Sequence, residues 1–167
     1  SARGLLAAGR IDEVRQILET YGRWERDGTL PNSLRGDDAS DRDTSDAPLW
    51  FAVACEEWAA AQPGSRHAGD RLGILAQTRS QPRGRTLAEI LGSIGTAYCR
   101  GTPNGIQCDP ASGLVSSPAH FTWMDTNYPA GTPREGYPVC IQALWIRLLR
   151  LLARLDLPPA AEPWQAL

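Results

Sequence analysis

The sequence contains no lysine; all 17 of its basic residues are arginine, and it has only two histidines. The arginines are spread along the chain and form no basic run that could follow a nucleic-acid backbone. The formal net charge of −2 argues in the same direction. We therefore expect no nucleic-acid partner.

Long hydrophobic runs and metal-binding spacings are also missing. The most apolar stretch, residues 143–157, is interrupted by arginines, so no segment is expected to cross a membrane. The cysteines Cys55, Cys99, Cys108 and Cys140 include no C-x-x-C pair, and only two histidines are present to complete a zinc site. Isolated reduced thiols are typical of a cytoplasmic protein, so we expect that location and no metal.

Hydrophobic periodicity predicts a helical protein. Apolar residues recur at three- and four-residue steps in several segments that carry cap or stop residues at their ends. Thr86 and Glu89 have the spacing of a capping box, and Pro48 suits the first turn of a helix. The predicted helices span residues 11–24, 47–61, 86–98 and 139–155, with a helix end before Gly9 and a short helix over 71–78.

Strand patterns are short and the connections between helices are long. A two-residue period is found only around residues 105–116, so the fold class is predicted to be all-α. The connections 28–45 and 100–138 are long, and loops of that length in a compact domain are usually functional. We therefore expect one domain over residues 1–167 whose long loops form a cleft, with a proline-rich tail over 157–167.

The second long connection places a carboxylate beside an indole, in the sequence FTWMD at 121–125. A carboxyl group held against an indole loses hydration, which raises its pKa, so Asp125 is a candidate general acid. Trp123 could also stack on the apolar face of a sugar ring. The alternative is that Asp125 caps a turn while Trp123 fills the core.

Two earlier segments carry side chains of the kind that hydrogen-bond sugar hydroxyls. Asn32 and Arg35 form one polar group, and Asp46 precedes a predicted helix with Trp50 as a candidate stacking wall. The alternative for Asp46 is an ordinary helix N-cap. The acidic run over 37–43 lacks the glycine and glutamate of an EF-hand loop, which favours a solvated loop over a calcium site.

Six ordered segments resemble the glucosidase domain of glycogen debranching enzymes. They are LPNSL at 30–34, SDAPLWF at 45–51, GI at 105–106 with Asp109, TWMD at 122–125, GTPR at 131–134 and QALW at 142–145. The resemblance implies a partial (α/α)6 toroid of about five helices. It also implies hydrolysis of α-1,6-glucosidic branch points in glycogen or limit dextrin, with inversion and without a cofactor.

The resemblance assigns roles residue by residue, with Asp125 as the general acid. An inverting glycosidase also needs a carboxylate that activates water. In the family that base lies near the C-terminal end of the toroid, so we expect it, and the remaining part of the toroid, outside this chain. Cys140 stands where the family usually has glutamate. The expected substrate-binding residues are Asn32, Arg35, Asp46, Trp50, Trp123, Arg134 and Gln142.

Two other functions are compatible with the same residues. Another (α/α)6 hydrolase, such as a trehalase or a glucoamylase, would share the fold but differ in linkage preference. A non-catalytic glucan-binding protein is favoured by Cys140 and by the absent base, whereas the intact TWMD segment weighs against it. Substrate profiling separates the first alternative, and binding without turnover would establish the second.

Overall fold

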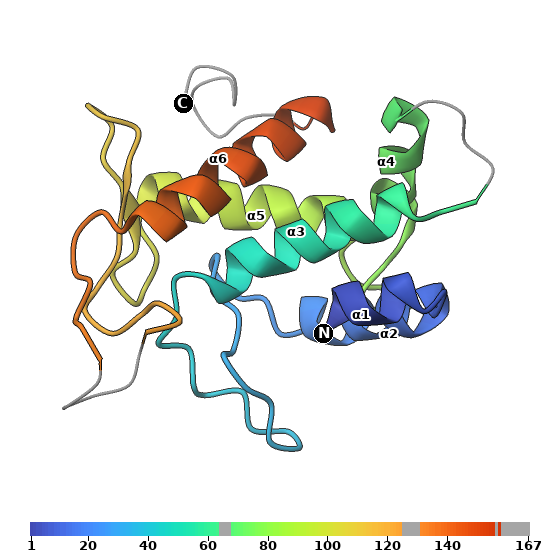
Figure 1. Ribbon diagram of the computed structural model, residues 1–167, viewed down its shortest axis with the longest axis horizontal. Helices are drawn as coiled ribbons and strands as arrows, with labels where there is room; N and C mark the ends of the chain where they lie inside the picture. Colours follow the sequence, from blue (N-terminus) through green and yellow to red (C-terminus); the bar gives the residue numbers. More distant parts are fainter. Residues whose placement is uncertain (64–67, 125–130, 156, 158–167) are drawn as a thin grey trace.

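The computed structural model describes residues 1–63, 68–124, 131–155 and 157. This part of the chain holds six helices and one two-stranded antiparallel sheet (Figure 1). The all-α prediction is confirmed, and the architecture is consistent with part of an (α/α)6 toroid. The elements are α1 (Ala2–Ala7), α2 (Ile11–Gly22), α3 (Ala47–Ala60), α4 (Ala68–Gln77), α5 (Leu87–Arg100), β1 (Gln107–Cys108), β2 (Val115–Ser116) and α6 (Val139–Arg154).

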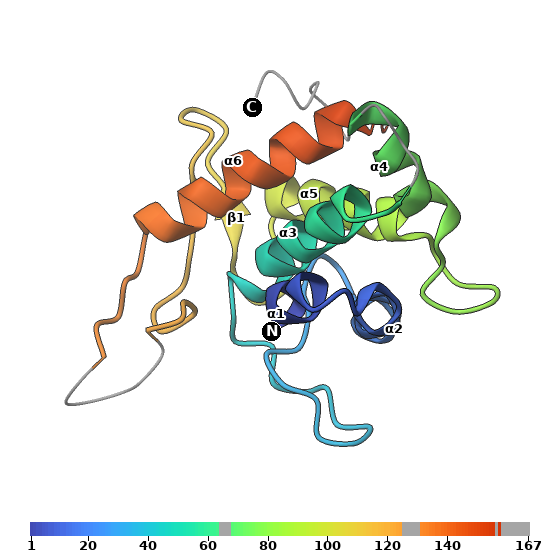
Figure 2. The same cartoon turned by 45° about the vertical axis from the view of Figure 1, so that its right-hand side comes forward.

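Helix α3 is the centre of the fold. Its sequence is apolar around most of its circumference, and such a helix must be covered on several sides. It packs against α1, α2, α4, α5 and α6, and both views show α1 and α2 on one side of it with α6 on another (Figures 1 and 2). The only charged residues of α3 are Glu56 and Glu57. The charged groups of the helix are therefore confined to one place near its C-terminal end.

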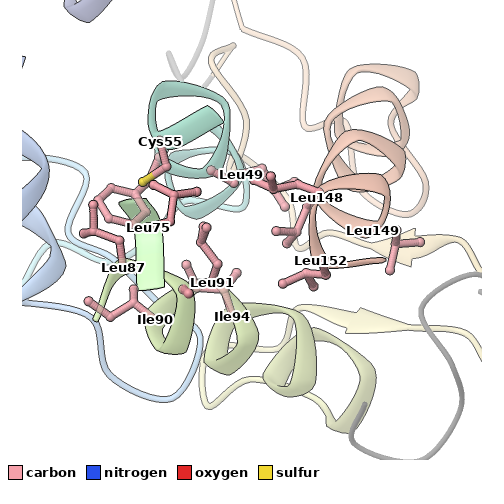
Figure 3. Close-up of a cluster of buried hydrophobic side chains, with 14 of the residues drawn as sticks. Leu49, Cys55, Leu75, Leu87, Ile90, Leu91, Ile94, Leu148, Leu149 and Leu152 are labelled. Carbon is pink, nitrogen blue, oxygen red and sulfur yellow. The ribbon is translucent and has the colours of Figure 1, made fainter. Parts of the chain in front are cut away.

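The hydrophobic core fills the space between α3, α5 and α6 (Figure 3). Leu49 of α3, Leu91 of α5 and Leu148 of α6 point into this space. Each buried leucine contributes about 1.5–3 kcal/mol relative to an exposed one. Aromatic side chains extend the core, because Trp145 stacks on Tyr98 with ring centroids 5.8 Å apart. The core therefore reaches toward the loops that precede α6.

Local sequence signals account well for the helix boundaries. The Thr86 hydroxyl accepts a hydrogen bond from Glu89 N at 3.1 Å, and the Glu89 carboxylate accepts one from Thr86 N at 2.6 Å. The predicted capping box of α5 is thus confirmed. Gly9 adopts φ +72° just after α1, as expected of a residue that ends a helix. The two strands fall inside the predicted 105–116 region.

Helix α6 is buried on the sides that face α3 and α5, and Ile146 and Val139 are exposed. No helix in the described part of the chain is long and apolar enough to span a bilayer. The predicted tail over 157–167 lies outside the described residues except for Leu157.

The indole of Trp58 offers a test of the role of α3. Its side chain is 1% exposed, and its Nε1 donates to the Ile11 carbonyl of α2 at 3.1 Å. Trp58→Ala should lower the free energy of unfolding by about 3–5 kcal/mol, measured by urea denaturation. The control Ile146→Ala removes a 48% exposed side chain and should change it by less than about 1 kcal/mol. Equal losses would show that α3 is not the centre of the core.

Candidate functional site

The candidate site is built on residues 117–136, which we call the site loop. Ser117 N donates to Gly136 O at 2.7 Å, and Gly136 N donates back to Ser117 O at 3.0 Å. One step further out, His120 N donates to Pro133 O at 2.7 Å. These bonds close the base of the loop. Asp125, the predicted general acid, lies outside the described residues.

Ser45 attaches the site loop to the N-terminal end of α3. Its backbone N donates to Phe121 O at 2.7 Å, and its hydroxyl bonds the Ser117 hydroxyl at 2.8 Å. Its carbonyl accepts a hydrogen bond from the Tyr98 hydroxyl of α5 at 2.9 Å. Ser45 is fully buried, so each of these bonds satisfies a group that water cannot reach. The attachment places the segment that leads to TWMD beside the residue that precedes Asp46.

The carboxylate of Asp46 is not used to cap α3. Asp46 occupies the N-cap position, but its side chain makes no cap hydrogen bond. The Thr44 hydroxyl instead accepts from Ala47 N at 3.2 Å and donates to Asp46 Oδ1 at 2.7 Å. The N-cap alternative is therefore confirmed for the position of Asp46 but not for a capping hydrogen bond from its side chain. Asp46 is partly buried and oriented by a neighbouring hydroxyl, which suits a carboxylate that binds a ligand.

The negative charge of Asp46 contributes to the pKa of the Tyr98 hydroxyl. Burial, and secondarily the negative charge of Asp46, raise the pKa of the Tyr98 hydroxyl far above its ordinary value. The phenol therefore stays protonated and acts as a hydrogen-bond donor to Ser45. The bond that supports the site is thus insensitive to pH over the physiological range.

Trp50 lies one helical turn after Asp46, with its backbone N donating to Asp46 O at 2.8 Å. Its indole is 46% exposed, and the Arg3 guanidinium lies 5.7 Å from the ring centroid. Arg3 is held there by hydrogen bonds to Glu57 of the same helix, from 2.6 to 3.0 Å. The position of Trp50 is thus compatible with its predicted role as a stacking wall.

Trp123 is the most exposed tryptophan of the described residues, at 66%. The core-filling alternative for this side chain is therefore wrong. The Arg134 guanidinium lies 5.6 Å from its ring centroid, so a cation–π contact joins the two strands of the site loop above its base. Arg134 itself adopts φ +47°, a conformation that is uncommon outside glycine. The loop thus holds a strained arginine against an indole that faces water.

Asn32 and Arg35 belong to a different part of the surface. Both are exposed and lie on the segment 30–42, whose tip is closed by the pairing of Arg35 with Asp38. Asp38 and the other carboxylates of the acidic run are exposed as well, as expected of a solvated loop. In both views this segment projects away from the site loop (Figures 1 and 2). The structure does not bring its tip together with Trp123 and Arg134.

The side-chain amide of Gln142 makes two hydrogen bonds to the backbone of β2. Its Oε1 accepts from Val115 N at 2.8 Å, and its Nε2 donates to Val115 O at 2.9 Å. The amide group therefore pairs with Val115 as a neighbouring strand would, and it holds β2, which leads to Ser117. Gln142 thus positions the base of the site loop.

Sequence patterns did not single out several residues of the site. Ser117 and Tyr98 make their contacts to Ser45 across long stretches of chain, so no local spacing marks them. His120 adopts φ +65°, and its buried Nδ1 has no hydrogen-bond partner. No turn signature in the sequence indicates this conformation. Strain at His120 and Arg134 is typical of a loop whose shape matters for function.

Comparison with known families supports the resemblance described above. The sequence model of one family, described as Amylo-alpha-1,6-glucosidase, matches residues 1–162 of the 167. The match covers both strands, all six helices and the entire site loop. No curated protein matches the chain.

Removal of the Ser45 hydroxyl tests the attachment of the site loop. Ser45→Ala should lower the free energy of unfolding by about 1–3 kcal/mol, because the buried Ser117 hydroxyl loses a partner. Hydrogen exchange at the Ser117 and Gly136 amides should accelerate more than exchange in α3. Ser40→Ala, at an exposed position of the segment 30–42, is the matched control. Unchanged exchange at both amides would show that the loop is held by other contacts.

Proposed function

Because this chain belongs to the amylo-alpha-1,6-glucosidase family, we propose that it acts in the hydrolysis of α-1,6-glucosidic branch points of glycogen or limit dextrin. One structural observation supports the proposal in addition to the family match. Ser45 N bonds Phe121 O, which joins the segment leading to TWMD to the end of α3 that bears Asp46 and Trp50. Two groups of residues that resemble the family's sugar site are thus neighbours in the fold.

We assign the acid step to Asp125. Its carboxyl group gives a proton to the glycosidic oxygen as the bond to the anomeric carbon breaks. A water molecule attacks that carbon from the opposite face and gives up a proton to a second carboxylate, so the configuration inverts. We place this second carboxylate in polypeptide outside residues 1–167, which would complete the toroid.

The other side chains would bind the sugar. Trp123 and Trp50 are exposed indoles that would stack on glucose rings, and Asp46 and Arg134 would bond hydroxyl groups. Gln142 would contribute by holding β2 in place. Because the tip of the segment 30–42 points away from the site loop, we propose that Asn32 and Arg35 contact parts of the branched glucan beyond the cleaved glucose.

A non-catalytic glucan-binding protein is the second candidate. Cys140 favours it, because a thiol at this position cannot replace the carboxylate that the resemblance leads one to expect there. The family match favours the debranching reaction over the trehalase and glucoamylase alternatives. Binding of maltooligosaccharides without turnover, even with the complete polypeptide, would decide for the second candidate.

We also propose a cytoplasmic location. All four cysteines are free thiols. Burial raises the pKa of Cys99 to about 11 and that of Cys55 further still, so both stay protonated and unreactive at neutral pH. Thiols kept in this form are compatible with a reducing compartment.

The acid step is tested by Asp125→Asn in a polypeptide that contains the complete toroid. Glucose release from a branched limit dextrin should fall at least about 10²-fold, because an amide cannot donate the acid proton. Glucan affinity, measured by calorimetry, should change little. The chain of residues 1–167 alone should release no glucose.

Asp12→Asn is the matched carboxylate control for this experiment. Asp12 is exposed on α2, 3.6 Å from the Arg15 guanidinium, and belongs to none of the six segments that resemble the family. The control should keep its activity. Full activity of Asp125→Asn would remove Asp125 from its assigned role, and release by residues 1–167 alone would show that the base lies inside the chain.

Trp123→Ala tests the stacking role separately from stability. We expect about a five- to tenfold loss of maltooligosaccharide affinity, because one stacking contact is worth about 1–1.5 kcal/mol, with a change in unfolding free energy below about 1 kcal/mol. Tyr137→Ala removes a side chain that is 49% exposed and serves as the aromatic control. Equal affinity of the two variants would exclude Trp123 from the sugar site.

A further inference from the structure

A second concave surface lies toward the C-terminal ends of α3 and α6, where α4 forms its third side. This groove has a volume of about 780 Å³. Its apolar lining comes from Ala60, Leu72 and Ala153, and its polar lining is dominated by arginine side chains. It lies at the opposite end of α3 from Asp46, so the proposed glucosidase site does not account for it.

Among the residues that the structure describes, the arginines of this region outnumber the carboxylates that pair with them. Glu56 accepts from Arg147 at 2.8 Å and from Arg154 at 2.9 Å. Glu57 pairs with Arg147 at 3.2 Å and with Arg3 at 2.6 Å. Three guanidinium groups thus share two carboxylates. The hydrogen bond from Arg3, followed by that from Arg147, lowers the pKa of Glu57, so its carboxylate stays charged and holds both arginines in place.

Arg150 adds a further positive charge to the groove. It stands three residues after Arg147 and four before Arg154, so the three side chains share one face of α6. It is exposed, and within the described part of the chain it has no ion pair and no hydrogen bond. Like charges at these spacings destabilise a helix, so such a cluster is more favourable when an anion binds it.

We propose that this groove binds a small molecule that carries a phosphate or diphosphate group. The planar guanidinium donates two parallel hydrogen bonds to an oxyanion, and the fixed Arg147 and Arg154 provide such donors beside Arg150, which pairs with no carboxylate of the described residues. The apolar floor and the volume leave room for an organic body attached to the phosphate. The ligand is a small molecule because the charge is confined to one groove of a chain whose net charge is −2.

Pyrophosphate is the probe for this site, titrated by calorimetry into the full chain at constant ionic strength. Saturable binding with one site per chain is expected. Arg150→Ala should weaken it at least about tenfold, because a charge-assisted hydrogen bond and a unit charge are lost. Arg83→Ala is the control of equal charge change, since Arg83 is exposed in the turn between α4 and α5. It should leave the affinity unchanged.

A second variant separates a binding site from a purely structural ion-pair network. Glu56→Gln frees Arg147 and Arg154 from a competing carboxylate and should tighten pyrophosphate binding, whatever its effect on the melting temperature. If Arg150→Ala and Arg83→Ala weakened pyrophosphate binding equally, the affinity would depend only on the net charge of the chain, and the proposal would be overturned. The lack of saturable binding in the unsubstituted chain would overturn it as well. None of these outcomes depends on glucosidase activity.

Discussion

The position of the site loop depends on the hydrogen bonds of one buried serine. Ser45 uses its N–H, its hydroxyl and its carbonyl to join the site loop, Ser117 and Tyr98 at the start of α3. Because a buried polar group without a partner costs about 1–3 kcal/mol, the packing that excludes water from Ser45 is favourable only when these bonds form. Tyr98 stacks on Trp145, so the attachment is continuous with the hydrophobic core. Hydrophobic packing thereby determines where the predicted sugar-binding loop lies.

Helix α3 connects the two regions to which we assign function. Its apolar surface accounts for its central place. Its charged groups are the N-cap Asp46 and, near the C-terminal end, Glu56 and Glu57. At its N-terminal end Asp46 and Trp50 lie beside the site loop, and near its C-terminal end Glu56 and Glu57 organise the arginine groove. Arg3 contacts both parts, since its guanidinium bonds Glu57 and covers the ring of Trp50. Substitutions at Arg3 would therefore affect the two regions together.

Much of the helical structure could be predicted from local spacing. The boundaries of α2, α3 and α5 follow the periodicity and the capping residues closely, and the short strands fall within the one region of alternation. The six segments that resemble the debranching glucosidases indicate the same family as the model that matches residues 1–162. Asp125, by contrast, remains a prediction, because it lies outside the described residues.

The sequence by itself determined the helices and the family, because both depend on residues that are close along the chain. Helix formation follows contacts three and four residues apart, and a family motif is a short ordered string. Only the tertiary structure decided which polar side chains are available to a ligand. Thr44 caps α3 and leaves the Asp46 carboxylate available, whereas Val115 occupies the amide of Gln142 from 27 residues away. The Thr44 cap is a contact between residues three apart, but the pairing of Gln142 depends on a distant strand coming within hydrogen-bond reach, and no local pattern encodes it.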